Sequence, residues 1–587
     1  MPSSSSKLYS APAILLAAAL LLSFIVRIRL ANAPLERDEG EHLYLAQMML
    51  DGNAPWKLAY NLKLPGADAV CAVFLTLFGQ TVAALRTGLL IVNTITVFLV
   101  ALLGKRLFGI SAGLVAGAAY AFLSTSQNVV GTVFHSTHLV ALFSVIATLL
   151  LLRSDLKPWR LFLTGLAFGL TFLMKQPGAA LAAFGALYVI LRWRQTRASV
   201  SAGVKALLSF GLGCALPYGL LCVALWRAGV FDRFWFWTVT LAEAYATQRS
   251  FDIALTFLKD SLPRVILPNL FLWLIAATGL GLAVSIKSTR NSGLFTAGLM
   301  IFSALAVSAG ANFNPNYFIM MFPALALSVG ALMAAGPILI EEQAHAFEAA
   351  NSPAARNKAA KKSRKKRKST DRPERETGPA RGSFFASRYA PNLPFLFCSI
   401  ACLFSALVQG SYLFAMSPYE FERSSYGENP FPEAVQAGEY IRTHSDPGAK
   451  LAVLGSEAEI YFYAHRRAAT GYLFTYSLME THKYAEGLQR DMIKEIEAAR
   501  PEYIVYASAY FSWLATPKSS MTFYAWMSEY VVSHYDAVGI IEITATGSTK
   551  YVWGSAATRY QPKSGNYLVI SRRKSEPVSS GREAATP

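Results

Sequence analysis

The sequence predicts a polytopic α-helical membrane protein that ends in a small α/β domain outside the membrane. Hydrophobic residues make up 53% of the 587 residues and charged residues only 15%, whereas soluble domains carry about 25% charged residues. Apolar runs recur between residues 11 and 415, and a bilayer-spanning helix needs roughly 20 mostly apolar residues. Positive charge gathers on one side of these runs. The composition therefore excludes an ordinary soluble enzyme.

About eleven of the apolar runs are interpreted as membrane-spanning helices. They cover residues 11–30, 81–103, 107–125, 136–152, 160–174, 178–191, 204–226, 265–285, 292–310, 317–339 and 395–415. The stretch 67–79 is too short to span and is interpreted as a surface helix or a half-buried lead-in to the second span. The first run is similar to a signal peptide, but with so many later spans we expect it to be retained.

Lysine and arginine predict the orientation of these spans, because basic loops stay on the cytoplasmic side. Basic clusters follow the even-numbered spans at 105–106, 153–160, 192–197, 287–290 and 355–388. The last cluster holds thirteen Lys/Arg against three acidic residues. Beside a membrane, such a run is expected to set topology and to contact anionic lipids, so we expect no nucleic-acid partner. The loops on the other face, and everything after residue 415, are then non-cytoplasmic.

The chain divides into a membrane region and a separate outer domain. The predicted parts are a transmembrane catalytic region 1–339, a disordered basic cytoplasmic loop 340–394, a last span 395–415, an extracytoplasmic α/β domain 416–575 and a disordered tail 576–587. Residues 450–455 and 501–506 have the pattern of strands. Residues 484–500 between them place apolar groups at helical spacing. Strand, helix and strand in this order indicate an α/β unit.

The loop after the first predicted span concentrates acidic residues. Glu36, Asp38, Glu39 and Glu41 fall within six positions, and carboxylates so close together repel one another. One interpretation is structural, because residues 39–50 look helical and acidic residues at a helix start complement the helix dipole. The other interpretation is functional, because acidic residues that are costly to crowd mark a place where chemistry is performed.

Basic and aromatic residues near the membrane surface are further candidates. Lys63 precedes a Pro-Gly turn, where a lysine either holds a phosphate as a point charge or extends along the surface toward water. Lys175 lies near the outer end of the fifth span. It either extends toward the outer interface or, because a charge at that depth is costly, marks a functional site with a lipid phosphate or a loop acid as partner. Tyr317 follows an Asn-Pro-Asn turn, although tyrosine is also an ordinary interface residue.

Metal and cofactor chemistry has little support in the sequence. His135 and His138 are spaced so that they could share one helix face and bind a cation, but the spacing identifies no third ligand. None of the five cysteines forms a CxxC pair, so no zinc site or disulfide framework is indicated. No G-x-G-x-x-G fingerprint follows a strand. We therefore expect that no cofactor is required. The sequence does not exclude a divalent cation, but no metal ligands can be assigned.

Five sequence elements, taken in order, resemble those of the GT-C glycosyltransferases that use polyprenyl-phosphate sugars. They are Asp38-Glu39, Lys63-Leu64-Pro65, Phe78-Gly79 followed by Arg86, Leu173-Met174-Lys175, and Tyr317-Phe318 with Phe322-Pro323. The nearest likenesses are the bacterial family-39 type proteins, the protein O-mannosyltransferases and the lipid A aminoarabinose transferases. Each element is weak alone, whereas five in order, on the sides that charge predicts, form a specific pattern. The resemblance implies the GT-C fold.

The resemblance also implies an activity. It implies an inverting glycosyltransferase that moves a hexose or pentose from a polyprenyl-phosphate donor to a hydroxyl of a glycan, lipid or protein acceptor, on the outer face of the cell (inner) membrane. Asp38 would be the general base and Glu39 its helper. Lys63 and Lys175 would bind the donor phosphate. Four further residues are expected to contact substrate, namely Glu41, Arg86, His138 and Tyr317.

The chain departs from these relatives in two places, and two other functions remain open. The aminoarabinose transferases carry a glutamate where this chain has Leu62, and many relatives carry an acid in the second outside loop, where this chain has His135 and His138. A transporter or flippase of lipid-linked glycans would place charges deep in several spans and show internal repeats; no repeat is found. A non-enzymatic membrane scaffold would leave the loop acids without a purpose.

Overall fold

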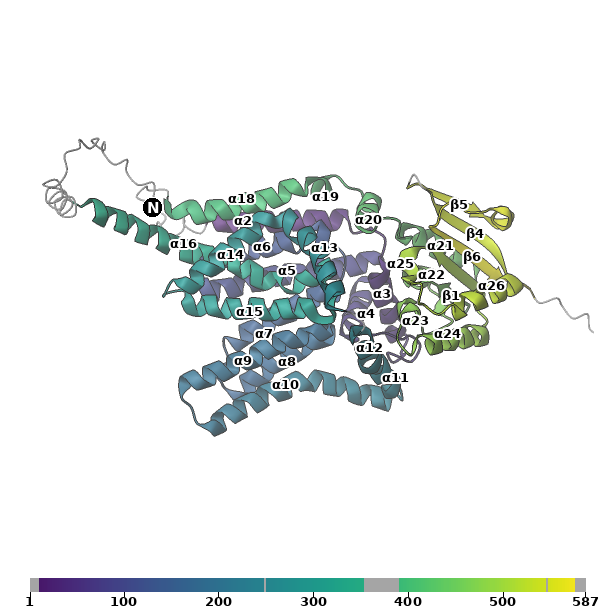
Figure 1. Cartoon of the computed structure of the whole chain (residues 1–587), viewed down its shortest axis with the longest axis horizontal. Coiled ribbons are helices and arrows are strands. Elements are labelled where there is room, and N and C mark those ends of the chain that lie inside the picture. The colour runs from purple at the N-terminus through teal and green to yellow at the C-terminus, as the bar shows by residue number, and fades with distance from the viewer. Residues whose placement is uncertain (1–9, 248–249, 353–389, 545–546, 576–587) are drawn as a thin grey trace, which may run out of the picture.

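The computed structural model describes residues 10–247, 250–352, 390–544 and 547–575. A bundle of long helices is joined at one end to a domain built on a six-stranded sheet (Figure 1). The predicted basic segment 355–388 and the predicted tail 576–587 lie outside the described residues.

Every predicted span coincides with a helix. The helices are α2 (Ser10–Arg29), α5 (Val82–Phe108), α6 (Ile110–Leu123), α7 (Ser136–Leu151), α8 (Pro158–Met174), α9 (Ala179–Thr196), α10 (Val200–Arg227), α14 (Leu270–Ser285), α15 (Arg290–Ser308), α16 (Phe322–Asn351) and α18 (Leu393–Val408). Within the described ranges, seven helical stretches are long and apolar enough to cross a membrane, whereas α6, α7 and α8 are shorter. The multi-pass helical fold is confirmed, and the count of eleven crossings stays a prediction.

The basic connection between α9 and α10 lies at the end of the bundle that faces away from the sheet. Figure 1 shows the connection between α9 and α10 and the C-terminal end of α16 at the left, and the sheet domain at the right. Within the bundle, α8 and α10 pack closely, because a Cβ at Gly165 would lie 2.1 Å from the carbonyl oxygen of Phe210. Small residues let helices approach one another where lipid supplies no hydrophobic drive. This packing fixes the end of α8, which precedes Lys175.

Short helices cover the end of the bundle that carries the sheet. They are α3 (Arg37–Leu50), α4 (Gly66–Phe78), α11 (Phe231–Trp235), the π-helical turn η3 (Phe236–Leu241), α12 (Ala242–Thr247) and α13 (Phe251–Ile266). The apolar stretch 67–79 corresponds to α4, whose Cys71, Phe74 and Leu75 are buried. It is therefore a half-buried helix before the second span, which is one of the two predicted alternatives.

The outer domain has a mixed sheet in the order β2-β1-β3-β6-β4-β5. Its strands are β1 (Lys450–Leu454), β2 (Arg467–Ala468), β3 (Tyr503–Ser508), β4 (Tyr535–Ile543), β5 (Thr549–Trp553) and β6 (Tyr567–Arg573). β1 pairs in parallel with β2 and β3, whereas β6 runs antiparallel to β3 and β4. The predicted strand, helix and strand are β1, α24 (Ala485–Ala499) and β3. The antiparallel half of the sheet was not predicted.

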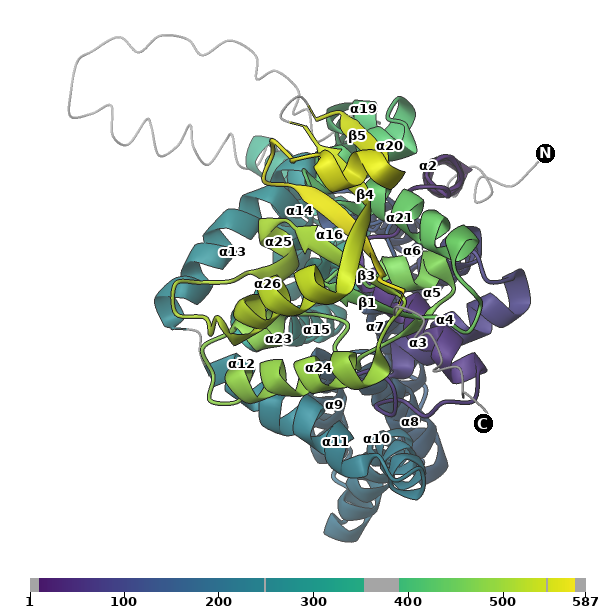
Figure 2. The same ribbon diagram turned by 90° about the vertical axis from the view of Figure 1, so that its right-hand side faces the viewer.

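Helices of the outer domain lie between the sheet and the bundle or on the outer face. They are α20 (Pro418–Tyr426), α21 (Phe431–His444), α22 (Glu459–Ala464), α23 (Tyr476–Met479), α25 (Tyr510–Trp513) and α26 (Thr522–His534), whereas α19 (Gly410–Phe414) continues α18 beside α2. When the molecule is viewed from the side of the sheet domain, this domain lies in front of the end of the bundle (Figure 2).

The outer domain is fixed to the bundle through α3. The backbone of α22 lies directly on α3, because a Cβ at Gly40 would lie 2.4 Å from the Cα of Glu459. The hydroxyl of Tyr44 accepts a hydrogen bond from the N–H of Ala468 at 2.8 Å. The hydroxyl of Tyr463 accepts another, at 2.8 Å, from the N–H of Leu35 just before α3. These contacts position the acidic start of α3 between bundle and sheet.

Candidate functional site

A cavity of about 860 Å³ lies where the bundle meets the outer domain. This size falls within the range of roughly 300–1,000 Å³ that is typical of small-molecule sites. Its wall includes the start of α3, the loop 60–63, the turn after α8, the connection from α15 to Tyr317, η3 with α12, and the segment 472–480 of the outer domain. Parts of the chain that are far apart in sequence therefore converge on one space.

Asp38 presents its carboxylate to this cavity. The side chain is 39% exposed, and the Nζ of Lys63 lies 2.7 Å from its Oδ1 and 2.6 Å from the Oε2 of Glu41. Burial favours the protonated form of Asp38, but the ammonium of Lys63 outweighs this effect and holds the pKa of the Asp38 carboxyl well below its usual range. Asp38 is therefore an anion that faces a cavity beside a shared cation.

Glu36 and Glu41 support this arrangement from either side of Asp38. Glu36 is the N-cap of α3: its carboxylate accepts the backbone N–H of Glu39 at 3.0 Å. Burial and the charges of Asp38 and Glu39 raise the pKa of Glu36 well above its usual value. Burial also raises the pKa of Glu41, in spite of its contact with Lys63. Both residues line the cavity, so the structure brings Glu41 to the predicted site.

Glu39 lies next to Asp38 in the sequence but on the buried side of α3. Its side chain is fully buried and forms an ion pair with Arg86. It also accepts the backbone N–H of Phe134 at 2.6 Å, while Arg86 donates to the carbonyl of Thr132 at 3.2 Å. Neither Glu39 nor Arg86 lines the cavity. The pair joins α3, α5 and the loop before α7, and the expected roles of Glu39 beside the base and of Arg86 at the substrate stay predictions.

Lys175 and Tyr317 form the side of the cavity that belongs to the bundle. Lys175 follows the last residue of α8, and its Nζ lies 4.3 Å from the centre of the Tyr317 ring. In the described part of the chain, Lys175 forms no ion pair. Burial and the nearby charge of Lys63 lower the pKa of Lys175 to about 8. The structure thus brings Lys175 and Tyr317 to the predicted site, with the lysine available for an anion.

The two histidines separate in the structure. His135 lies beside the acidic start of α3, and one ligand atom each from Glu36, Asp38 and His135 fall within 4.8 Å of one another. Burial lowers the pKa of His135 to about 3, so the ring is neutral. His138 is fully buried at the start of α7 and does not line the cavity. The structure therefore does not bring His138 to the cavity, and its expected contact with substrate stays a prediction.

The outer domain contributes aromatic residues that the sequence analysis did not select. Tyr472, Phe474 and Tyr476 line the cavity at alternate positions, together with Tyr60 and Trp237. The signal available in the sequence was the aromatic alternation itself. It could not be assigned to the site, because the contact of this segment with α3 depends on how the two parts of the chain pack.

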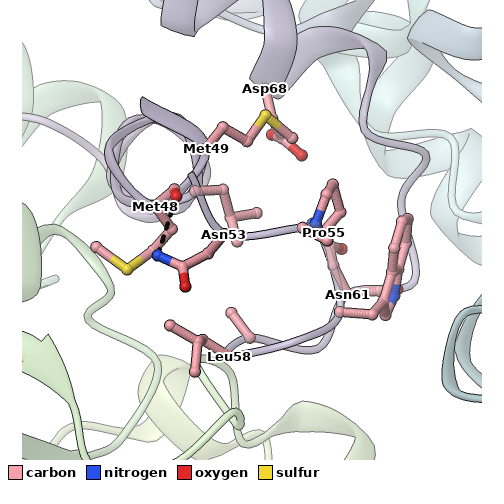
Figure 3. A pocket seen from close by; sticks show the side chains of 11 residues that line it. Met48, Met49, Asn53, Pro55, Leu58, Asn61 and Asp68 are labelled. Atoms are coloured by element: carbon pink, nitrogen blue, oxygen red, sulfur yellow. Dashed lines mark hydrogen bonds between the residues drawn. The ribbon is translucent and has the colours of Figure 1, made fainter. Parts of the chain in front are cut away.

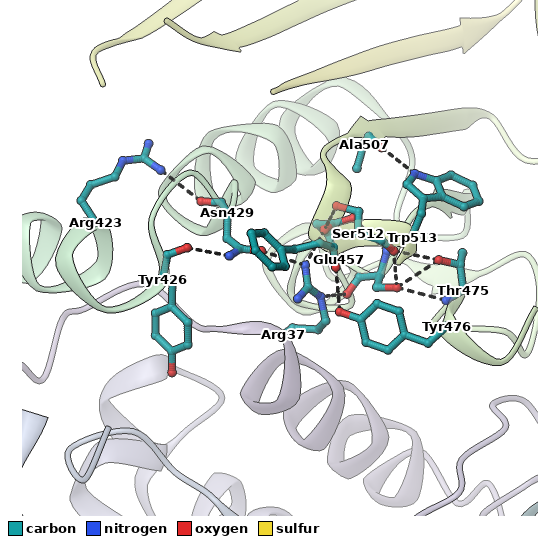
Figure 4. A network of polar contacts seen from close by, with 12 residues as sticks. Arg37, Arg423, Tyr426, Asn429, Glu457, Thr475, Tyr476, Ala507, Ser512 and Trp513 are labelled. Carbon is teal, nitrogen blue, oxygen red and sulfur yellow. Dashed lines mark hydrogen bonds and ion pairs between the residues drawn. The ribbon is translucent and has the colours of Figure 1, made fainter. Parts of the chain in front are cut away.

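A network of polar contacts fixes this segment relative to Asp38 (Figure 4). Arg37 pairs with Glu457 at 3.0 Å. The carboxylate of Glu457 accepts the hydroxyl of Ser512, whose carbonyl accepts the hydroxyl of Thr475 at 2.8 Å. Thr475 stands between Phe474 and Tyr476, and Arg37 immediately precedes Asp38. The network therefore ties the aromatic segment to the start of α3.

A second hollow beside α3 is too small to be the site. It holds about 20 Å³, close to the room for one water molecule. Figure 3 shows its lining, which includes Met48, Asn53, Leu58 and Asp68. Asp68 is occupied by a hydrogen bond with His42. We therefore place the functional site in the large cavity.

Comparisons with known proteins agree with the resemblance found in the sequence. Residues 63–218 match the family described as dolichyl-phosphate-mannose-protein mannosyltransferase. The search of curated proteins found no significant match. The fold is similar to ArnT from Cupriavidus metallidurans bound to undecaprenyl phosphate, with a TM-score of 0.56 and 13% identity over 97% of this chain and 98% of that one. Its apo form gives a TM-score of 0.51 and 14% identity over 95% and 97% of the two chains.

The structural matches confirm the GT-C fold, and the family match over residues 63–218 agrees with the resemblance to the protein O-mannosyltransferases. The protein is a multi-pass membrane protein of this fold. At such low identity the structural likeness shows the fold alone, so the roles of the site residues rest on the geometry of the cavity.

Proposed function

We propose that the protein is an inverting glycosyltransferase that moves a sugar from a polyprenyl-phosphate donor to a hydroxyl acceptor on the non-cytoplasmic side of the membrane. The observation that carries the proposal is the carboxylate of Asp38, which opens into a large cavity at the end of the bundle. The undecaprenyl phosphate bound to the ArnT structure supports the class of donor. The basic connection between α9 and α10 at the opposite end of the bundle supports the orientation.

The reaction needs one base and one stabilised leaving group. Asp38 accepts the proton of the acceptor hydroxyl as its oxygen bonds to the anomeric carbon of the donor sugar. The bond from that carbon to the phosphate oxygen breaks, and its electron pair leaves with the polyprenyl phosphate. Because the acceptor attacks from the side opposite the phosphate, the anomeric configuration inverts.

Lys175 is suited to bind the phosphate of the donor. It comes from the end of α8, on the side of the cavity formed by the bundle, and no acidic residue in the described ranges pairs with it. A charged group that accepts the growing negative charge of a leaving phosphate stabilises the transition state. Tyr317, whose ring lies against the ammonium, holds Lys175 at this position through a cation–π contact.

Lys63 has a second task beside the expected contact with the donor phosphate. Its ammonium already bridges Asp38 and Glu41, and this contact keeps the pKa of Asp38 low. A donor phosphate in the cavity is a third anion for the same cation. As Lys63 shares its charge with the phosphate, its hold on Asp38 weakens and the pKa of Asp38 rises, which makes it a better base when the donor is bound.

A divalent cation is not needed for this scheme. Glu36, Asp38 and His135 offer ligand atoms close to one another, so the donor set could hold a cation such as Zn²⁺ or Mn²⁺. The ammonium of Lys63 already compensates Asp38 and Glu41, however, and a carboxylate oxygen of Glu36 is used to cap α3. We therefore assign the local positive charge to Lys63.

The test is a transfer assay on the full chain in lipid vesicles that contain a polyprenyl-phosphate mannose or aminoarabinose donor. Hydroxyl acceptors of the three classes, glycan, lipid and serine peptide, are supplied together. We expect cleavage of the donor and a glycosylated product, both lost in Asp38→Asn. Movement of intact donor across the vesicle without any cleavage would instead identify a transporter and overturn the proposal.

A further inference from the structure

The segment 472–480 gives the outer domain a direct part in the cavity. The rings of Phe474 and Tyr476 are both partly exposed there; they lie 5.8 Å apart, centre to centre, with an angle of 35° between them. We call these two rings the aromatic platform. We infer that the platform binds a sugar ring of the acceptor, which makes the acceptor a carbohydrate. This inference rests on the proposed function and goes beyond it by choosing among its three acceptor classes.

The platform lies within reach of the proposed base. The Nζ of Lys63 is 2.7 Å from the carboxylate of Asp38 and 5.2 Å from the centre of the Phe474 ring. The guanidinium of Arg37 lies 5.6 Å from the centre of the Tyr476 ring. One lysine thus bridges the base and the platform. A ring that stacks on Phe474 can therefore place one of its hydroxyls at Asp38.

The chemistry of the platform matches a sugar. The face of a pyranose ring carries C–H groups that pack on aromatic rings, while its rim of hydroxyls requires polar partners. Here, the rings are flanked by Asp38, Ser477 and Glu480 in the same cavity wall. The positive groups of Lys63 and Arg37 lie beside the rings and would be costly neighbours for a lipid chain.

The backbone of this segment is poorly suited to a peptide acceptor. Extended peptides bind by adding a strand to a free edge, but the edge beside Tyr472 is already occupied by Tyr60, whose N–H donates to the carbonyl of Gly471 at 2.7 Å. The N–H of Gly471 itself donates to Glu495 at 2.8 Å. The N–H of Thr475 donates to the Ser456 hydroxyl at 3.0 Å. Recognition is therefore left to side-chain faces.

The position of the platform separates the acceptor from the donor. Lys175 and Tyr317, which are proposed to hold the donor phosphate, belong to the bundle. The platform belongs to the outer domain, and α3 lies between the sheet domain and the bundle (Figure 1). The network through Arg37, drawn in Figure 4, fixes the platform relative to the start of α3. The acceptor and the donor phosphate would therefore be held by different parts of the chain.

The binding test uses the full chain in nanodiscs and ligand-observed saturation-transfer NMR. The probes are the methyl glycosides of mannose, glucose, galactose and N-acetylglucosamine, with a serine peptide for comparison. We expect saturation transfer to at least one glycoside. The signal should be lost in Phe474→Ala and Phe474→Leu, which keeps apolar bulk without a ring, and retained in Phe474→Tyr. Tyr551→Ala removes an exposed ring on β5 outside the cavity and should change nothing.

A kinetic test separates the acceptor from the donor sugar. Phe474→Leu should raise the KM for a carbohydrate acceptor about tenfold, the loss expected when an aromatic contact is removed, and leave the KM for the donor unchanged. A rise in the donor KM alone would show that the platform holds the donor sugar, and a signal from the peptide but from no glycoside would equally overturn the inference. If glycosides bind but the wild type transfers no sugar to any acceptor, the sugar site stands and the proposed function fails.

Discussion

Asp38 and Glu39 are adjacent in the sequence, but their side chains lie in different environments. The Asp38 side chain is 39% exposed and opens into the cavity beside a shared lysine. The Glu39 side chain is fully buried and held by Arg86 and by the backbone N–H of Phe134. Successive residues of a helix point about 100° apart, so one acid of the pair faces the cavity and the other faces the protein. Acidic residues that are adjacent in the sequence, such as Asp38 and Glu39, can therefore have different roles.

The largest effect is expected when the charge of Asp38 is removed. Asp38→Asn keeps the size of the side chain but removes the base, so we expect the transfer rate to fall by about 10² to 10⁴-fold. The measurement is the rate of product formation in vesicles. Thermal unfolding of the same preparation is the control, and its midpoint should stay close to that of the wild type. A variant with full transfer would show that Asp38 is not the base.

Glu39 should respond in the opposite way. Glu39→Ala leaves the buried guanidinium of Arg86 without its partner, which costs about 3–5 kcal/mol of stability. We expect the midpoint of thermal unfolding in detergent to drop clearly, with less folded protein recovered. If instead the variant unfolds like the wild type and has lost transfer, Glu39 acts in the chemistry, as the sequence first suggested.

Substitution of Lys175 tests which residue binds the donor phosphate. A charged hydrogen bond to phosphate contributes about 1.5–3 kcal/mol, so Lys175→Gln should raise the KM for the donor about tenfold to a hundredfold. Lys175→Arg keeps the charge and should retain most of the affinity. An unchanged donor KM in Lys175→Gln would place the phosphate elsewhere.

The lowered pKa of Lys175 predicts a pH dependence. A lysine is charged below its pKa and neutral above it, so donor binding should be full at pH 7 and weaken as the pH rises past about 8. The KM for the donor should then rise about tenfold for each further pH unit. Lys175→Arg stays charged over this range and should flatten the profile. A wild-type profile that is flat to pH 10 would contradict this assignment.

Removal of divalent cations should have the smallest effect. Because Lys63 supplies the positive charge between Asp38 and Glu41, dialysis against a chelator should leave the transfer rate unchanged. Loss of activity that returns only with added Zn²⁺ or Mn²⁺ would assign a catalytic cation to Glu36, Asp38 and His135.

The sequence predicted the helices well, because long apolar runs and one-sided positive charge are local signals. It also placed Asp38, Glu41, Lys175 and Tyr317 in one site, since the resemblance fixes their order along the chain. It did not separate Asp38 from Glu39. The predicted helix began at residue 39 rather than at Arg37, so the face of each acid could not be assigned.

The positions of the other candidate residues have tertiary causes. The burial of His138 depends on how α7 packs in the bundle, and the buried pairing of Arg86 depends on the position of α3. The aromatic platform depends on the docking of the outer domain through Arg37 and Glu457, which are 420 residues apart in the sequence. Local pattern carries no information about such contacts.

The central claim is that Asp38 directs an acceptor hydroxyl at the face of the donor sugar opposite the phosphate. The most direct measurement is the anomeric configuration of the transferred sugar, read by NMR from the proton coupling at the anomeric carbon, in the product of the wild-type chain. The account predicts the configuration opposite to that of the donor, and no product from Asp38→Asn. A product that keeps the configuration of the donor would contradict it.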